Sequence, residues 1–178
     1  MTLLEKLPKP SKLWPVYAVI VLMIYGWTIR WFIWKLSSWL YYLRLDEILA
    51  ILSYAFTVDL LESLLVLGLI VALALILPKA WFEEEFVARG TLLALLGLGY
   101  SIYIASLFQD RNDFPRSFIL RSFPVALIAS LLLSYAAPRL RWAKWALEEF
   151  ANRATIFLYI LVPLSLISLL IVIWRNLF

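Results

Sequence analysis

Four ionisable residues interrupt long apolar segments of the sequence: Arg30, Asp59, Glu62 and Arg121. Placing a charge in hydrocarbon is costly, so each ionisable residue at membrane depth is a candidate functional residue. Two carboxylates and two guanidinium groups can form a polar pocket for a cation, a lipid headgroup or another substrate. Carboxylates also act as general acid and base without histidine. Asp59 and Glu62 are three residues apart, which places both on one face of a helix.

The same four residues have a simpler, structural interpretation, which we prefer. Opposite charges can pair with one another, and long side chains can extend to water from shallow depth. A carboxylate near the start of a helix, as expected for Asp59 and Glu62, is also stabilised by the helix dipole. Because no third group defines a reaction, the sequence names no catalytic residue, and an enzyme is the less favoured class.

The chain contains no cysteine and no histidine. This excludes a haem held by two histidines, an H-E-x-x-H zinc site and a Ser-His-Asp triad, and it disfavours haem, iron–sulfur and zinc sites in general. The five glycines lie within or beside apolar runs and form no phosphate-binding loop. No cofactor and no metal site are predicted.

The composition is that of a membrane protein. Of the 178 residues, 65% are hydrophobic and 16% are charged, and the mean hydropathy is +0.91. A soluble domain is typically about half apolar and about one quarter charged. A soluble core of this size cannot hide so much apolar surface. We therefore expect an all-α integral membrane protein, with residues 1–178 forming a single polytopic domain.

Five apolar segments are long enough to cross a bilayer as helices, which takes about 20 residues each. They span residues 13–34, 60–77, 87–108, 118–137 and 154–174. The tryptophans fall at the expected span ends or in the connections, as in the aromatic belt of membrane proteins. The sequence thus predicts a bundle of about five transmembrane helices.

Two aromatic segments outside these spans are expected to lie along the membrane interface. Residues 38–56 carry Arg44, Asp46 and Glu47 at their centre, which disfavours a crossing; alternatively, their second half extends the second helix. Residues 139–153 have the pattern of an interfacial amphipathic helix. An extension of the fifth helix explains that segment equally well.

The helix expected over 87–108 carries small residues at helical spacing. They are Gly90, Ala94, Gly97, Ser101 and Ala105. Small residues in this pattern allow two membrane helices to approach closely. Packing within the bundle is the preferred interpretation, and a contact with another subunit is the alternative.

Two further groups receive no chemical role. Glu83, Glu84 and Glu85 are interpreted as a solvated charge run, because consecutive side chains on a helix point in different directions. The tyrosines Tyr100, Tyr103 and Tyr159 are candidates for hydrogen bonds within the bundle.

Basic residues are slightly more numerous on the N-terminal side of the expected bundle. The positive-inside rule then places the N-terminus in the cytoplasm and the C-terminus outside the cell (inner) membrane. The net charge of +4 is assigned to contacts with lipid headgroups, so nucleic acid is not an expected partner.

The favoured function is an accessory or structural subunit, or a membrane anchor, of a larger membrane complex. The spans use most of the chain, and no soluble domain remains for chemistry. Membrane lipids and other membrane subunits are the expected partners. The alternative is a membrane-embedded enzyme or lipid-handling protein that uses the four ionisable residues. A transporter or channel component ranks third, because five spans do not divide into two inverted halves.

Overall fold

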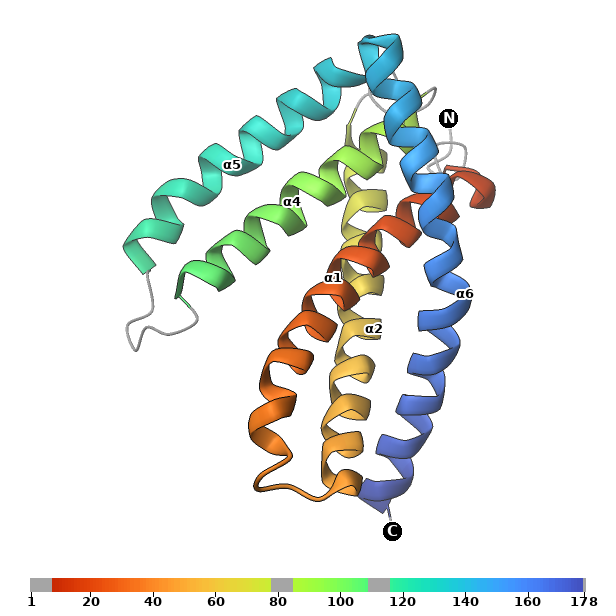
Figure 1. The fold of residues 1–178 in the computed structure, drawn as a ribbon. Coiled ribbons are helices and arrows are strands. Elements are labelled where there is room, and N and C mark those ends of the chain that lie inside the picture. Colours follow the sequence, from red (N-terminus) through yellow and green to blue (C-terminus); the bar gives the residue numbers. More distant parts are fainter. Residues whose placement is uncertain (1–7, 78–84, 109–115, 178) are drawn as a thin grey trace.

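The computed structural model describes residues 8–77, 85–108 and 116–177, and it is helical over 94% of them with no strand. Five long helices and one 3₁₀ turn make up the fold (Figure 1). They are α1 (Pro10–Trp39), α2 (Leu45–Ile76), α4 (Phe86–Phe108), α5 (Arg116–Ala136), the turn η2 (Ala137–Arg139) and α6 (Arg141–Leu177). All five helices are long and apolar enough to cross a membrane. The expected all-α membrane bundle of five helices is confirmed.

Helix α1 is the centre of the bundle. It packs against α2, α4 and α6, and every residue from Pro15 to Val21 is buried. Because consecutive positions point all round a helix, seven buried residues in a row mean that neighbours enclose this part of α1 on all sides. Most of the apolar core is therefore built around the first half of the first helix.

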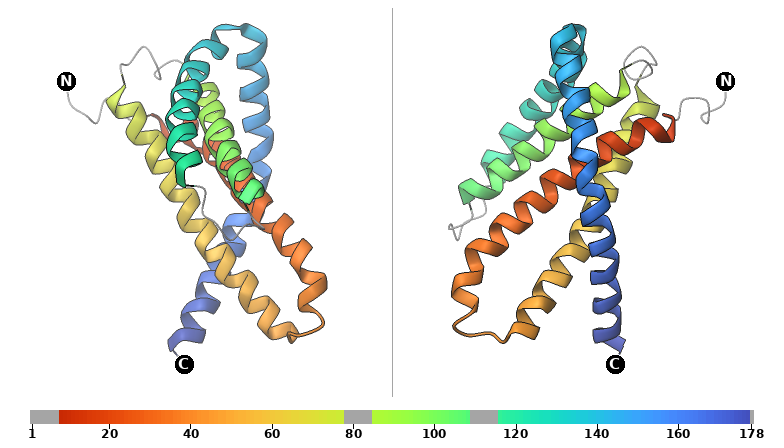
Figure 2. Two further views of the ribbon diagram at one scale, coloured as in Figure 1. Left: turned by 90° about the vertical axis from the view of Figure 1, so that its left-hand side faces the viewer. Right: turned by 45° about the vertical axis from the view of Figure 1, so that its right-hand side comes forward.

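Helices α4 and α5 form a hairpin that leaves the rest of the bundle at an angle (Figures 1 and 2). The buried residues of α4 all lie between Phe86 and Ala94, in its first half. Within α5 only Ser130 and Ser134 are buried. The hairpin is thus attached to the bundle at one end, and no described helix outside the hairpin buries its other end.

Helices α2 and α6 begin earlier than the apolar spans in the sequence. The structure favours the extension alternative for both aromatic segments, since residues 45–56 belong to α2 and residues 141–153 belong to α6. Neither stretch contains proline or glycine, so nothing interrupts the helix. The start of α2 is fixed by the Arg44 backbone N–H, which donates to Glu47 Oε2 at 2.8 Å.

Candidate functional site

Of the four ionisable candidates, Asp59 is the one that the structure buries. It lies about 21 Å along α2 from Leu45, at 1.5 Å per residue, and only 4% of its surface is exposed. Its Oδ1 accepts a hydrogen bond of 2.8 Å from Thr28 Oγ1 on α1. Its Oδ2 is buried and has no hydrogen-bond partner among the described residues. One oxygen of this carboxylate is satisfied and the other is not.

Hydroxyl groups from three helices surround the same turns of α2. Tyr25 of α1 shares a hydrogen bond of 2.6 Å with Ser165 of α6, and Tyr17 shares one of 3.2 Å with Ser63 of α2. Together with Asp59 and Thr28, we call these residues the polar core. All but Thr28 are buried. The polar core joins α1, α2 and α6 through side-chain hydrogen bonds inside an otherwise apolar bundle.

The sequence carries a signal for the polar core in its uncharged polar residues, which a pattern of charged residues alone does not reveal. Ser63 follows Asp59 by four residues, and Thr28 follows Tyr25 by three, so each pair shares a helix face. Polar residues aligned on one face of an apolar helix are expected to point toward the bundle interior. The partners on the opposite helices were not predictable, because they depend on how the helices are rotated and tilted.

The structure does not gather the other three predicted residues around Asp59. Glu62, Arg30 and Arg121 are exposed, and the ion pairs of the described residues include none between these four. The Arg30 guanidinium lies 5.4 Å from the centre of the Trp27 ring instead. A single pocket in which two carboxylates face two guanidinium groups is not formed.

Arg121 lines a separate open groove between α4 and α5. The groove has a volume of about 550 Å³ and also contains Ser117, Ser122 and Tyr100. Tyr100 and Ser122 share a hydrogen bond of 2.7 Å across the hairpin, which is a contact of the kind expected for Tyr100. The other two candidate tyrosines, Tyr103 and Tyr159, are 56% and 81% exposed.

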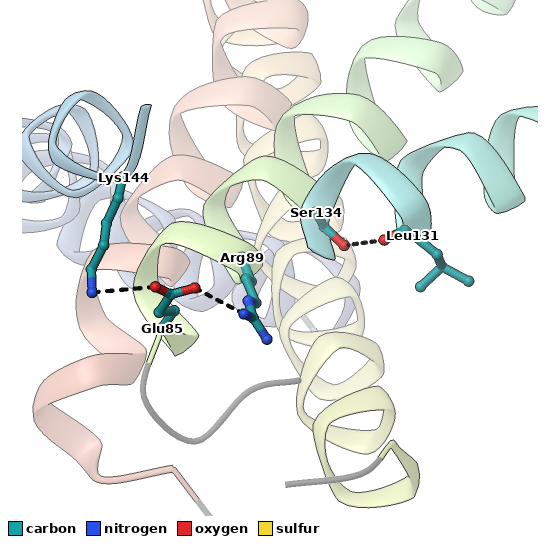
Figure 3. Close-up of polar contacts among 5 residues, drawn as sticks. All are labelled: Glu85, Arg89, Leu131, Ser134 and Lys144. Carbon is teal, nitrogen blue, oxygen red and sulfur yellow. Dashed lines mark hydrogen bonds and ion pairs between the residues drawn. The ribbon is translucent and has the colours of Figure 1, made fainter. Parts of the chain in front are cut away.

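A compact ion cluster fixes the attached end of the hairpin (Figure 3). Arg89 Nη2 donates to Glu85 Oε2 at 2.8 Å, and Lys144 of α6 approaches Glu85 Oε1 at 3.5 Å. The Arg89 guanidinium also lies 5.4 Å from the ring centre of Tyr135 on α5. The side chains of Glu85 and Arg89 are only 19% and 8% exposed. The cluster therefore connects α4 to α5 and α6.

This cluster corrects the interpretation of Glu85 as part of a solvated charge run. Glu85 begins the first turn of α4, where Arg89 is four residues further on and on the same face. The α6 helix supplies Lys144, which approaches the other side-chain oxygen of Glu85. Glu83 and Glu84 lie outside the described residues.

The small residues of α4 are divided between two environments. At Gly90 a Cβ atom would lie 3.1 Å from both Cγ atoms of Val16 on α1, and Ala94 is only 2% exposed. At Gly97 a Cβ atom would meet nothing within 4 Å, and Ser101 and Ala105 are exposed. Among the described residues, the first half of the column packs closely and the second half is exposed.

The exposed half of that column borders a second groove. This groove lies between α2 and the α4–α5 hairpin and has a volume of about 220 Å³. Gly97 and Ser101 line it from α4, Val66 and Leu69 from α2, and Leu127 from α5. Ser101 contributes a hydroxyl group to this groove, Gly97 has no side chain, and Val66, Leu69 and Leu127 are apolar.

Among the described residues, no three acidic side chains lie close enough together to hold a metal ion. Comparison of the chain with protein-family models, with curated proteins and with solved structures finds no match. The proposals below therefore rest on the polar core, the ion cluster and the two grooves.

Proposed function

We propose that the protein is a non-catalytic subunit of a larger membrane complex, and that its α4–α5 hairpin packs against a transmembrane helix of another subunit. One observation carries the proposal. The column of small residues on α4 continues past the contact with α1 onto a surface that no described residue covers, at Gly97, Ser101 and Ala105. The small-residue pattern is the one that membrane helices use where they approach each other closely.

Contact with lipid gives no physical reason for small residues at these positions. Lipid chains pack equally well against leucine, and a glycine inside a helix costs about 1 kcal/mol relative to alanine. A second helix does give a reason, because the absence of side chains allows the two backbones to come close and gain van der Waals contact. The groove beside Gly97 and Ser101 then accommodates the larger side chains of the partner helix.

The polar residues give less support to a membrane-embedded enzyme or lipid-handling protein. Asp59 is enclosed between α1 and α2, whereas Arg121 lines the groove between α4 and α5. A reaction that needs both charges at one substrate would require the hairpin to move toward the bundle. The subunit function requires no such movement.

Replacement of Gly97 by leucine tests the proposal. We expect purification of Gly97→Leu from the native membrane in mild detergent to lose a stoichiometric membrane protein that co-purifies with the unchanged chain. Gly99→Leu is the matched control, since Gly99 is also a glycine of α4 with open space at its Cβ. It lies two residues away and so faces another direction.

The two variants also separate assembly from folding. Because a Cβ meets no atom within 4 Å at either position, both chains should fold and elute alike after they are purified alone. A chain that purifies from its native membrane without any stoichiometric protein partner would contradict the subunit function. Equal loss of the partner in both variants would contradict the assignment of the interface to the Gly97 face.

A further inference from the structure

The polar core contains a negative charge without a matching positive one. Asp59 is enclosed in an apolar bundle, and Thr28 is the one side chain that donates a hydrogen bond to it among the described residues. An ionised carboxylate in such surroundings is strongly disfavoured unless it is paired and hydrogen-bonded. An ionised Asp59 would therefore need a positively charged partner at its Oδ2 atom.

No side chain of the described helices supplies that charge. On α1 the residues around Thr28 are Tyr25, which interacts electrostatically with Asp59, and Arg30, which is exposed and stacked on Trp27. On α2 the nearest charged residue is Glu62, which adds a second negative charge. On α6 no charged residue occurs between Arg153 and Arg175. The described helices therefore provide no positive charge that could compensate Asp59.

The surroundings of Asp59 are rich in neutral oxygen atoms. Tyr25 Oη lies 3.4 Å from the carbonyl oxygen of Phe56, one turn before Asp59 on α2, and it contacts Ser165 Oγ on the other side. Ser63 places a further hydroxyl one turn after Asp59. Hydroxyl and carbonyl oxygens are the ligands that hard, small cations accept. They also form the hydrogen-bonded chains along which protons move.

We propose that Asp59 binds a small cation, either a proton or an alkali-metal ion, at its Oδ2 atom inside the bundle. The bound cation neutralises the carboxylate and completes the polar core that joins α1, α2 and α6. Thr28 is a positioning residue, because its hydroxyl orients the carboxylate through Oδ1 and leaves Oδ2 directed at the cation. This site is independent of the interface proposed on the hairpin.

Infrared spectroscopy of the full chain in lipid vesicles tests for the proton. A protonated carboxyl group has a carbonyl stretching band that an ionised carboxylate lacks. We expect this band at neutral pH and expect its loss in Asp59→Asn. Thr28→Val keeps the carboxyl group but removes its hydrogen bond, so the band should shift to higher frequency. Asp46→Asn is the matched control, because it removes an exposed carboxylate of α2 that lies thirteen residues from Asp59 and should leave the band unchanged.

Thermal unfolding in different salts tests for the alkali-metal ion. If the infrared band is absent, Na⁺ at ten times its Kd should raise the Tm by about 3–6 °C over choline chloride of the same ionic strength. Asp59→Asn should abolish the rise, and Thr28→Val should reduce it. Absence of both the infrared band and the Na⁺-dependent rise in the unchanged protein would overturn the proposal. Because both measurements use the unchanged protein, this outcome does not depend on whether the variants fold.

Discussion

At the scale of single residues, burial distinguishes two ion pairs that are otherwise alike. Glu85–Arg89 and Glu149–Arg153 are both four residues apart on one helix, with N–O distances of 2.8 Å and 2.7 Å. The first pair is 19% and 8% exposed in its Glu and Arg side chains, and the second is 40% and 78% exposed. Water screens the second pair but is largely excluded from the first, so removing one partner of the first pair should destabilise the protein more.

We expect Glu85→Gln to lower the free energy of unfolding by about 2 kcal/mol, the typical value of a buried hydrogen bond between charged groups. Glu149→Gln is the control and should cost less than about 0.5 kcal/mol, as exposed pairs on helices do. Unfolding of both variants by a denaturing detergent measures the difference. Equal losses would show that the Glu85 cluster is as well hydrated as the surface pair.

The candidate site was predictable from the sequence only in part. The apolar surroundings of Asp59 in the chain marked it as an ionisable residue at membrane depth, but the preferred interpretation paired it with another charge or placed it within reach of water. The structure instead buries it beside Thr28. The same reasoning suggested a pocket that Arg121 shares with Asp59, and the structure does not form that pocket. Sequence spacing determines which residues share one helix face, whereas contacts between helices depend on tilt and rotation. The hairpin tilt separates Arg121 from Asp59, and nothing local in the sequence encodes it.

At the scale of elements, helix α4 has a packed half and an open half. Its first turns are held between α1, α5 and α6 through Gly90 and the Glu85 cluster. Its later turns contact α5 and the open groove. The sequence shows one continuous column of small residues over both halves, so it could not reveal where the intramolecular contact ends.

Gly90→Leu should destabilise the isolated chain, whereas Gly97→Leu should not. A Cβ at Gly90 already crowds Val16 at 3.1 Å, and overfilling a packed contact typically costs about 1–3 kcal/mol. Thermal unfolding of the two purified variants in the same detergent measures the effect. If both variants unfold at the same temperature as the unchanged chain, α4 does not approach α1 closely.

The lengths of α2 and α6 show a second limit of sequence reasoning. In the sequence the charges of Arg44, Asp46 and Glu47 disfavour a crossing, but in the structure they occupy the N-cap and the first turn of α2. Hydropathy indicates which residues can lie in lipid, whereas caps and helix-breaking residues determine where a helix begins and ends. The five spans were therefore predicted correctly in number, while the start of α2 lies fifteen residues before its expected position at 60.

At the scale of the whole molecule, five membrane crossings are expected to place the two chain ends on opposite sides of the bilayer. Helix α1 begins at one end of the bundle and α6 finishes at the other (Figure 1). The natural chain has no cysteine, so each introduced cysteine is the single reactive thiol. We expect a membrane-impermeant maleimide to label Lys9→Cys from the cytoplasm and Asn176→Cys from outside.

Ala18→Cys controls for that labelling experiment, because Ala18 is fully buried and should not react. Labelling of Lys9→Cys from outside would reverse the expected orientation. Labelling of both termini from one side would exclude five crossings.

The central place of α1 also bears on how the protein is made. Among the described helices α1 is synthesised first, and α2, α4 and α6 pack against it. Its Tyr25 shares a hydrogen bond with Ser165, which follows 140 residues later in the chain. Until α6 is synthesised, this tyrosine lacks its final partner. Contacts so distant in sequence form slowly. The packing of the described helices is therefore completed only when α6 joins α1.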